Sequence, residues 1–353
     1  MALHQLLNAI KIIALDDLNT GALAHFDLKM HQNKILIVRP IFPEVLARLA
    51  AHFDVESNQS DDACSAALLA QRLQGKQGVL TTGADRVDAA LLAQCPELKI
   101  CANMAVGYNN FDLPAMAAAG VVGTNTPDVL TETTADFGFA LLMATARRIT
   151  QGEAYLRGGH WTQWRFDLLA GADIHGSTLG ILGMGRIGQG IAKRGAHGFG
   201  MKVVYHNRSP LSAEREADCC ARYVSKQQLL ATADHLVLVL PYSPASHHAI
   251  GAAELAQMKP TATLVNIARG GIVDDAALAA ALESGRLAAA GLDVFEGEPA
   301  VHPQLLAQSN VVLTPHMASA SVSTRLAMAS LAADNLIAFF AGQPPLTPVE
   351  CAL

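Results

Sequence analysis

A glycine-rich turn carries the clearest chemical signal in the sequence. Gly183-Met-Gly185-Arg-Ile-Gly188 matches the pattern G-x-G-x-x-G, directly after the apolar run Leu179-Gly-Ile-Leu182. Between a strand and a helix, Gly183 permits the tight turn, Gly185 lets the backbone approach a pyrophosphate, and Gly188 allows close helix packing. The helix N-terminus then offers free N–H groups to phosphates. The turn predicts a dinucleotide site, against the alternative of a glycine turn that binds nothing.

The end of the next predicted strand bears on which dinucleotide is bound. Sites for NAD place Asp or Glu there, to accept hydrogen bonds from the ribose 2′-hydroxyl. The chain instead has Tyr205-His-Asn207-Arg208-Ser209, which contains no acid. Arg208 can form charge-assisted bonds to a 2′-phosphate, and Ser209 can donate a further hydrogen bond. The sequence therefore favours NADPH over NADH, against the alternative of an ordinary surface arginine.

Three further ionisable residues follow later predicted strands. Arg269 follows Val265-Asn-Ile-Ala268, Glu298 follows the strand that contains Gly291, and His316 follows Val311-Val-Leu313. The carboxyl ends of strands in open α/β sheets form the ligand crevice, so these side chains should converge beside the dinucleotide. Each residue alone could be a salt bridge, a solvated carboxylate or a loop histidine. Their placement after successive strands favours a catalytic group.

Two series of alternating strands and helices would position these residues. The first has strands at Ile35–Val38, Gly78–Leu80, Leu98–Cys101 and Val121–Val122, and helices at Phe42–Phe53 and Val87–Gln94. The second has strands at Leu179–Leu182, Lys202–Tyr205, Leu236–Leu240, Thr263–Ile267, Ala289–Val294 and Val311–Leu313. This alternation predicts parallel sheets covered by helices on both faces.

Two longer helices are expected outside these series. One begins at Thr131, a candidate N-cap, and continues to about Arg157. The other covers Ser323–Phe340 and follows the last strand. We expect the chain to change domain near Asn125–Thr131 and again near His316–Ser323. The C-terminal helix would then complete the first domain.

Composition limits the class of protein. The 353 residues are 51% apolar and 16% charged, which is typical of globular domains, and no apolar run predicts a membrane span. A net charge of -6 argues against nucleic acid as the main partner. The six cysteines form no C-x-x-C pair. We therefore expect reduced thiols in a cytoplasmic protein, no metal site and no cleavable signal peptide.

The sequence resembles the D-2-hydroxyacid dehydrogenase family, closest to its glyoxylate/hydroxypyruvate reductase (2-ketogluconate reductase) subgroup. The resemblance rests on four runs: Leu182–Gly188, Val265–Gly271, Gly291–Pro299 and Thr314–His316. It implies an α/β fold with two doubly wound parallel-sheet domains. Residues 129–318 would form an NAD(P)-binding Rossmann domain, and residues 30–128 with 319–353 a smaller, discontinuous, flavodoxin-like substrate domain. Residues 1–29 are an unmatched extension, for which one explanation is a natural start at Met30.

The resemblance implies roles for the three ionisable residues. Arg269 would pair with the substrate carboxylate and polarise the 2-oxo group. His316 would donate a proton to the carbonyl oxygen, and Glu298 would orient the imidazole and favour its charged form. The backbone N–H groups of Val106 and Gly107 would also hold the carboxylate.

Further contacts follow from the same resemblance. The cofactor would touch Arg186 and Ile187 at its phosphates and Asp293 at the nicotinamide amide, with Thr133, Leu240, Pro241 and Ile267 as further candidates. Trp164 would either reach the substrate pocket of a neighbouring subunit or lie in the core of a homodimer. The partners would be a small 2-oxo acid and a second copy of the chain, with no nucleic acid and no membrane.

The predicted activity is reduction of small 2-oxo acids to D-2-hydroxy acids with NADPH. Glyoxylate and hydroxypyruvate are the expected substrates, with 2-ketogluconate as a further candidate, and NADH as a second cofactor. One alternative is an NAD-dependent dehydrogenase of the 3-phosphoglycerate type, which the missing acid at residues 206–209 disfavours. Another is a dinucleotide-sensing binding protein similar to the family's corepressors, which also retain Arg, Glu and His.

Overall fold

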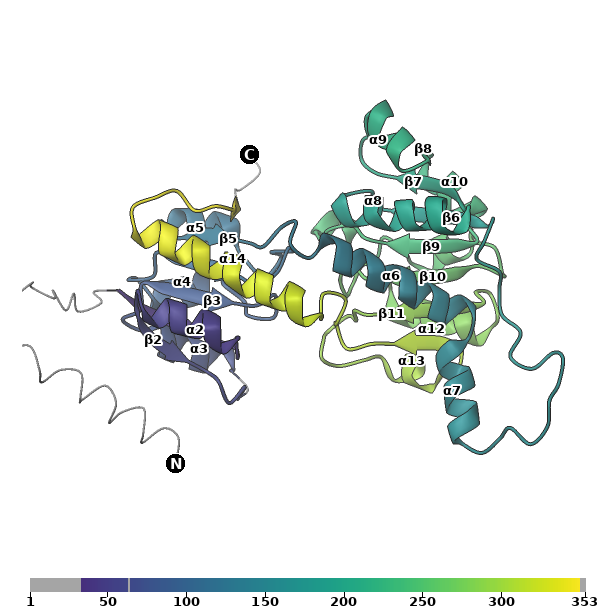
Figure 1. Ribbon diagram of the computed structural model, residues 1–353, viewed down its shortest axis with the longest axis horizontal. Helices are drawn as coiled ribbons and strands as arrows, with labels where there is room; N and C mark the ends of the chain where they lie inside the picture. The colour runs from purple at the N-terminus through teal and green to yellow at the C-terminus, as the bar shows by residue number, and fades with distance from the viewer. Residues whose placement is uncertain (1–32, 63, 350–353) are drawn as a thin grey trace, which may run out of the picture. The chain divides into compact units, whose positions relative to one another are not determined.

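The computed structural model describes residues 33–62 and 64–349 (Figure 1). The expected N-terminal extension, with Met30, lies outside the described residues. Two sheets of mainly parallel strands, one of six and one of seven strands, form the described part of the chain. The prediction of an α/β fold with two parallel-sheet domains is therefore confirmed. Among the described residues, no helix is both long and apolar enough to cross a membrane.

The first sheet has the strand order β13-β5-β4-β3-β1-β2. Its strands are β1 (Lys34–Ile37), β2 (Asp54–Ser57), β3 (Gly78–Thr81), β4 (Ile100–Asn103), β5 (Val122–Thr124) and β13 (Pro348–Val349). Only β13 runs antiparallel to its neighbour. One face is covered by α3 (Ala66–Leu73), α4 (Ala89–Gln94) and α5 (Leu113–Ala118), and the other by α2 (Pro43–Ala50) and α14 (Val322–Phe340).

The C-terminal helix α14 packs on this first sheet. Ala332, Ala333 and Leu336 are fully buried in the same apolar cluster as Ile35 of β1 and Ile100 of β4. Apolar contacts therefore join helix α14 to the first strands of the chain.

The second sheet is wholly parallel and has the order β12-β11-β10-β9-β6-β7-β8. Its strands are β6 (Thr178–Leu182), β7 (Lys202–His206), β8 (Ala221–Tyr223), β9 (His235–Leu238), β10 (Thr263–Asn266), β11 (Ala289–Leu292) and β12 (Val311–Leu313). This order reverses direction at β6, so β6 and β9 flank a topological switch point of the kind that binds dinucleotides.

Helices cover both faces of the second sheet (Figure 1). On one side lie α6 (Thr131–Ala146) and α8 (Arg186–Lys193), which continues into the π-helix η1 (Arg194–Gly198). On the other side lie α10 (Lys226–Thr232), α11 (Ala252–Leu255), α12 (Asp275–Glu283) and α13 (Pro303–Ala307). Two further helices are α7 (Ile149–Arg157) and α9 (Ala213–Asp218), and η2 (Pro244–Ser246) is a 3-10 turn.

The single helix expected from Thr131 to Arg157 is wrong. The helix ends at Ala146, and Arg148 adopts a left-handed φ of 54° before α7 begins. The backbone N–H of Ala172 donates to the Ala146 carbonyl at 2.9 Å, which satisfies an acceptor that a continuing helix would have used. Thr131 is also not the N-cap, because that position is Leu130, which makes no side-chain cap.

Strand limits differ from the prediction where turns extend into apolar runs. The expected strand Leu98–Cys101 is displaced, because the Leu98 N–H donates to the Cys95 carbonyl at 3.1 Å and belongs to a turn. The observed strand β4 ends at Asn103 instead. This shift places a buried asparagine at the carboxyl end of the sheet.

His235, the first residue of β9, is a buried histidine that should make the fold sensitive to acid. Only 1% of it is exposed. Its Nε2 lies 3.0 Å from the Asp173 carbonyl and its Nδ1 2.8 Å from the Thr263 hydroxyl. Burial lowers its pKa below 6.5, and the hydrogen bond to Asp173 opposes this shift only in part.

We expect the free energy of unfolding to fall as the pH drops below 6.5. In this range the unfolded chain takes up a proton that native His235 does not, which costs at most about 1.4 kcal/mol per pH unit until the native pKa is reached. His235→Gln should remove this part of the slope in urea titrations between about pH 5 and 7.5. The exposed His175→Gln is the control. Equal slopes for wild type and His235→Gln would contradict the assignment.

Candidate active site

The glycine turn after β6 has the clearances that a dinucleotide site needs. Gly183 has a φ of 103°, and an added Cβ would lie 2.6 Å from the Leu240 backbone nitrogen. A Cβ on Gly188 would overlap the Gly183 carbonyl oxygen, whereas a Cβ on Gly185 would have no atom within 4 Å. The helix α8 begins at Arg186, directly after this open position. The turn therefore fits a bound pyrophosphate at the helix N-terminus.

The residues that follow β7 differ in their surroundings. The Asn207 side chain accepts a hydrogen bond from the Met184 N–H at 2.6 Å, so it braces the glycine turn. Arg208 and Ser209 are exposed. Within the described residues, the Arg208 guanidinium takes part in no recorded ion pair or hydrogen bond. Its charge is therefore available to a ligand.

Some of the other residues predicted to contact the cofactor have partners within the chain, and others are buried in the core or exposed. Arg186 forms an ion pair with Asp128 at 2.7 Å, and Thr133 Oγ1 lies 2.6 Å from Thr324 Oγ1 of α14. Ile267 is buried in the core and Ile187 packs against the same cluster. Leu240 is half-buried and Pro241 is exposed.

His316 and Glu298 form a direct pair. Nδ1 of His316 lies 2.8 Å from Oε2 of Glu298, and the other oxygen of Glu298 accepts from the Phe295 N–H at 2.9 Å. Burial alone would raise the pKa of Glu298, but the hydrogen bonds from His316 and Phe295 outweigh it and lower the pKa below its usual value. The carboxylate therefore stays ionised and holds the Nδ1 edge of the imidazole. Within the described residues, Nε2 of His316 has no recorded hydrogen-bond partner.

Asp293 holds the segment that carries His316. It is fully buried, and its carboxylate accepts from the N–H groups of Met317 at 2.8 Å and Ala318 at 2.9 Å, and from the Thr314 hydroxyl at 2.7 Å. Burial raises the pKa of Asp293, against the opposing effect of these donors. The predicted contact of Asp293 with the nicotinamide amide stays a prediction. Its observed contacts make it a positioning residue for His316.

Arg269 meets the loop that contains Gly107. Its Nε donates to the Asn109 side chain at 3.1 Å and its Nη1 to the Ala268 carbonyl at 2.7 Å. A Cβ added to Gly107 would overlap Nη2 of Arg269 and lie 2.7 Å from its Cζ. Burial lowers the pKa of Arg269, opposed by the charge of Glu298. The structure thus brings two predicted groups, Arg269 and Gly107, into contact, with Glu298 close enough for its charge to act on the guanidinium.

Buried asparagines shape this loop, and sequence reasoning missed them. Asn103 donates to the Gly107 carbonyl at 3.1 Å, and Asn125 donates to the Val106 carbonyl at 2.8 Å. Asn110 donates to the carbonyls of the turn after β3. The N–H groups of Val106 and Gly107 donate to no other described residue. The loop therefore has two free donors and contacts the Arg269 guanidinium through Gly107, and asparagines at strand ends were the available signal.

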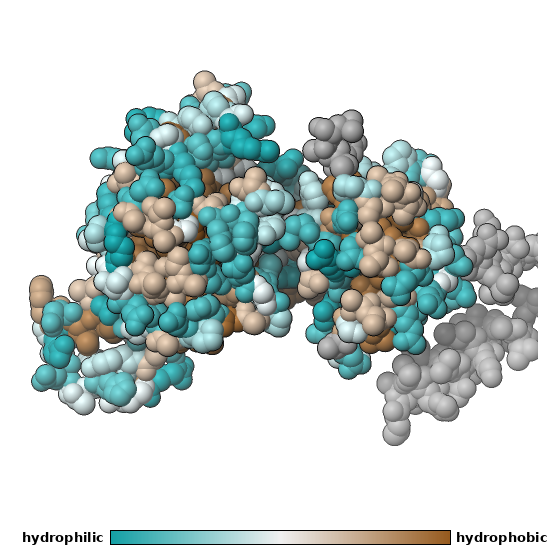
Figure 2. Space-filling model, turned by 180° about the vertical axis from the view of Figure 1, so that it is seen from behind, coloured by the Kyte–Doolittle hydropathy of each residue, from teal (hydrophilic) through white to brown (hydrophobic). Residues whose placement is uncertain are grey.

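Trp164 lies elsewhere, on the segment that follows α7. Its side chain is 75% exposed and packs edge-on against Phe166, with ring centroids 6.3 Å apart. Trp161, Phe166 and Leu156 are exposed on the same part of the chain. Figure 2 shows this part at lower left, where hydrophobic and hydrophilic surface alternate. Within one chain, Trp164 is therefore a surface residue.

Comparison with known proteins places the chain in a family. Residues 139–318 match the family model described as D-isomer specific 2-hydroxyacid dehydrogenase, NAD binding domain. The glyoxylate reductase of Thermococcus onnurineus is 44% identical over 321 residues, which cover 90% of this chain and 96% of that protein. The glyoxylate reductase of Aeropyrum pernix is 44% identical over 322 residues, which cover 90% of this chain and 95% of that protein.

A solved structure agrees with these sequence matches. The NADPH-dependent glyoxylate/hydroxypyruvate reductase of Sinorhizobium meliloti, in complex with NADP and malonate, aligns with a TM-score of 0.81 and 38% identity. The alignment covers 90% of this chain and 97% of that one. The chain therefore belongs to the D-isomer specific 2-hydroxyacid dehydrogenase family. It is an oxidoreductase that uses a nicotinamide dinucleotide.

Proposed function

We propose that the protein reduces small 2-oxo acids to D-2-hydroxy acids and prefers NADPH. Glyoxylate and hydroxypyruvate are the proposed substrates, and 2-ketogluconate is a further candidate. The names of the relatives support the first two substrates. The observation that carries the proposal is the group formed by the His316–Glu298 pair and by Arg269 against Gly107.

Substrate binding follows from the charge and donors at this group. A 2-oxo acid carries a carboxylate beside its carbonyl. The Arg269 guanidinium would pair with the carboxylate, and the free N–H groups of Val106 and Gly107 would donate to the same oxygens. Since Nε and Nη1 of Arg269 already have partners, the position of the guanidinium is fixed before substrate binds. This arrangement should favour substrates with a carboxylate over neutral ketones.

Proton transfer is assigned to His316. A bound nicotinamide dinucleotide supplies the hydride in this family's reaction. His316 would donate the proton to the carbonyl oxygen from Nε2, because Nδ1 is held by Glu298 at 2.8 Å. The ionised carboxylate of Glu298 accepts from Nδ1–H and holds the ring in place, and the protonated imidazole is the form that can donate from Nε2. In the oxidative direction the neutral imidazole would accept the same proton.

Arg208 should decide the preference between the two cofactors. We expect Arg208→Ala to raise the KM for NADPH by about 10- to 100-fold, because a charge-assisted bond to the 2′-phosphate is lost. The KM for NADH should stay within about twofold, since NADH has no group for Arg208 to bind. Initial rates with both cofactors measure this, with the exposed Arg86→Ala as control. Equal changes for NADPH and NADH would show that Arg208 does not select the cofactor.

Gly107 offers a way to displace Arg269 without removing it. In Gly107→Ala the new methyl would overlap the end of the Arg269 side chain, which can move away by giving up its bonds to Asn109 and Ala268 while the backbone stays in place. We expect the KM for 2-oxo acids to rise by at least about tenfold, with little change in melting temperature. Gly83→Ala is the matched control, because its Cβ would make only an ordinary 3.7 Å contact. Similar KM values for Gly107→Ala and wild type would place the carboxylate site elsewhere.

The remaining assignments are also proposals. We propose a homodimer whose interface includes α7 and the exposed segment with Trp164, since large apolar side chains there are exposed in the single chain. The domain limits stay at 30–128 with 319–353 and at 129–318. A cytoplasmic location is supported by the described cysteines, all of which are free thiols.

The experiment that tests the proposed function measures initial rates with glyoxylate and hydroxypyruvate, each with NADPH and NADH. Loss of nicotinamide absorbance gives the rate. Turnover that favours NADPH is the expected result. Turnover that favours NADH would overturn the cofactor assignment, and tight dinucleotide binding without turnover would favour the binding-protein alternative.

A further inference from the structure

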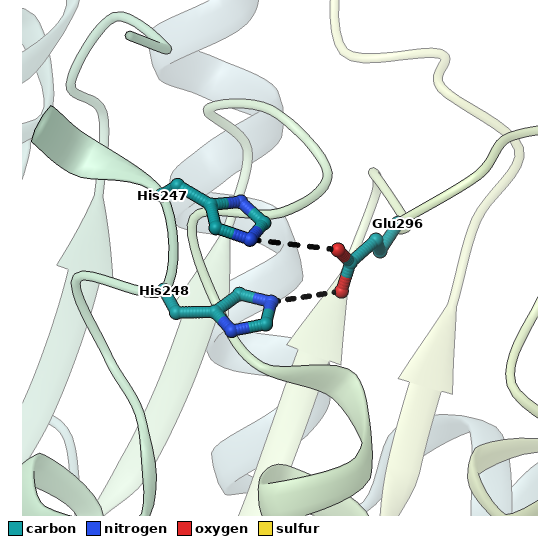
Figure 3. Close-up of side chains that lie close together, drawn as sticks. All are labelled: His247, His248 and Glu296. Atoms are coloured by element: carbon teal, nitrogen blue, oxygen red, sulfur yellow. Dashed lines mark hydrogen bonds and ion pairs between the residues drawn. The ribbon is translucent and has the colours of Figure 1, made fainter. Parts of the chain in front are cut away.

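A cluster of two histidines and a glutamate lies outside the group around Arg269. His247 and His248 follow η2, and Glu296 lies after β11. Each residue offers one ligand atom, and these atoms all lie within 4.8 Å of one another. Nε2 of His248 is 3.0 Å and Nε2 of His247 is 4.0 Å from the two oxygens of Glu296. Figure 3 shows both imidazoles directed at the same carboxylate.

The opposite edge of each imidazole faces a polar group. Nδ1 of His247 lies 3.2 Å from the Tyr242 hydroxyl, and Nδ1 of His248 lies 3.8 Å from a carboxylate oxygen of Asp274. Histidines that bind metals commonly use their second nitrogen for such an outer partner, which fixes the ring and its tautomer. The two rings are stacked, with centroids 3.9 Å apart and planes 23° from parallel. Both Nε2 atoms therefore face the Glu296 carboxylate and could bind the same ion.

The backbones of two cluster residues are anchored. The His248 N–H donates to the Gly271 carbonyl at 2.7 Å. The Glu296 N–H donates to the Asp275 carboxylate at 3.1 Å. Binding an ion here would therefore require small side-chain movements and no refolding of either segment.

Charge around the cluster favours a cation. Among the described ion pairs, Glu296 and Asp274 pair with histidines and with no lysine or arginine. Both carboxylates, together with buried Asp275, line a cavity of about 330 Å³. His302 lines the same cavity, and its buried Nδ1 has no hydrogen-bond partner. The carboxylates of Glu296 and Asp274 are therefore available to a cation.

We propose that His247, His248 and Glu296 bind a divalent transition-metal ion of the zinc type. Two imidazole nitrogens and one carboxylate oxygen are ligands that Zn²⁺ prefers, with a fourth position left for water. This departs from the expectation, based on sequence, that the chain has no metal site. The two histidines are adjacent and the glutamate is far along the chain, so no ligand spacing marks the site.

The ion would connect segments that flank the catalytic group. Glu296 lies two residues before Glu298, and a Cβ on Gly270, beside Arg269, would overlap the Phe295 carbonyl oxygen. A metal bound by Glu296 and the histidines would tie the chain after η2 to the segment that carries Glu298. We assign the ion a stabilising role in holding these segments together.

Metal titration of the full-length protein tests this proposal. The protein is first treated with a chelator and dialysed, and Zn²⁺ binding is then followed by calorimetry. Co²⁺ in place of Zn²⁺ gives an absorption spectrum that reports the ligands. We expect one site of this kind, and a rise in melting temperature on adding Zn²⁺.

Variants separate this site from other histidines. Glu296→Gln keeps the shape of the side chain and the backbone bond to Asp275, and His247→Ala removes one imidazole. Each should weaken Zn²⁺ binding by at least about tenfold and reduce the thermal shift, while the exposed His175→Ala should bind as wild type does. Melting temperatures in chelator check that each variant is folded. Unchanged affinity in both variants, or no Zn²⁺ binding by wild type, would overturn the proposal.

Discussion

His316→Asn should lower kcat for 2-oxo acid reduction by about 10²- to 10⁴-fold, the range expected when a general acid is removed. Asparagine suits this test because His316 has a left-handed φ of 50°, which asparagine adopts more readily than most residues. The backbone should therefore keep its bonds to Asp293. Affinity for the dinucleotide should not change, because the glycine turn and Arg208 are untouched.

Two comparisons sharpen this prediction. His175→Asn replaces an exposed histidine and should leave kcat unchanged. Glu298→Gln keeps a side-chain oxygen near Nδ1 of His316 but removes the charge, so kcat should fall by less than in His316→Asn. A His316→Asn enzyme with a kcat within about threefold of wild type would show that another group donates the proton.

Arg269→Lys should lower kcat/KM for glyoxylate by about 10- to 150-fold. The positive charge remains, but lysine lacks the planar fork that can pair with a carboxylate through two parallel hydrogen bonds. The loss corresponds to about 1.5–3 kcal/mol for a hydrogen bond to a charged group. Lysine would also lose the bond from Nε to Asn109, which holds the guanidinium against the loop.

Most of this loss should appear in KM, because the carboxylate is present in both the substrate and the transition state. Steady-state kinetics with glyoxylate and NADPH measure the division between KM and kcat. Arg86→Lys, at an 80% exposed side chain, is the matched control. An Arg269→Lys enzyme with the KM of wild type would mean that Arg269 does not bind the carboxylate.

The dinucleotide turn could be predicted because its constraints are local. A positive φ at Gly183 and the close approach of Gly188 to the Gly183 carbonyl each demand glycine at one position of the sequence. Most strands of the second sheet are likewise buried apolar runs, but β8 (Ala221–Tyr223) is partly exposed and carries no such signal. The limits of the six predicted strands differ from the observed limits by at most two residues, and these differences do not move the glycine turn.

Other features depend on partners that sequence reasoning could not see. The helix α6 ends at Ala146, where the carbonyl accepts a hydrogen bond from the Ala172 N–H. The segment between these residues has no repeating pattern that would predict this contact. The strand β2, Asp54–Ser57, is partly exposed and polar, so it lacks the apolar signal of its neighbours. The asparagines that hold Val106 and Gly107 act by hydrogen bonding, which leaves no periodicity in the sequence.

In the candidate catalytic group, some features could be predicted from the sequence and others could not. Strand order predicted that Arg269, Glu298 and His316 lie at one edge of a sheet, and the 2.8 Å contact of His316 with Glu298 is the geometry that this order allows. The support given by Asp293 to the segment of His316 depends on buried hydrogen bonds, and only the folded chain reveals it.

The most direct test of the central claim is analysis of the product formed from hydroxypyruvate. The protein is incubated with hydroxypyruvate and NADPH, and the glycerate is separated by chiral chromatography while NADPH absorbance is followed. We predict D-glycerate in an amount equal to the NADPH consumed. L-glycerate as the product, or no consumption of NADPH by a protein that binds it, would contradict the assignment of Arg269 and His316.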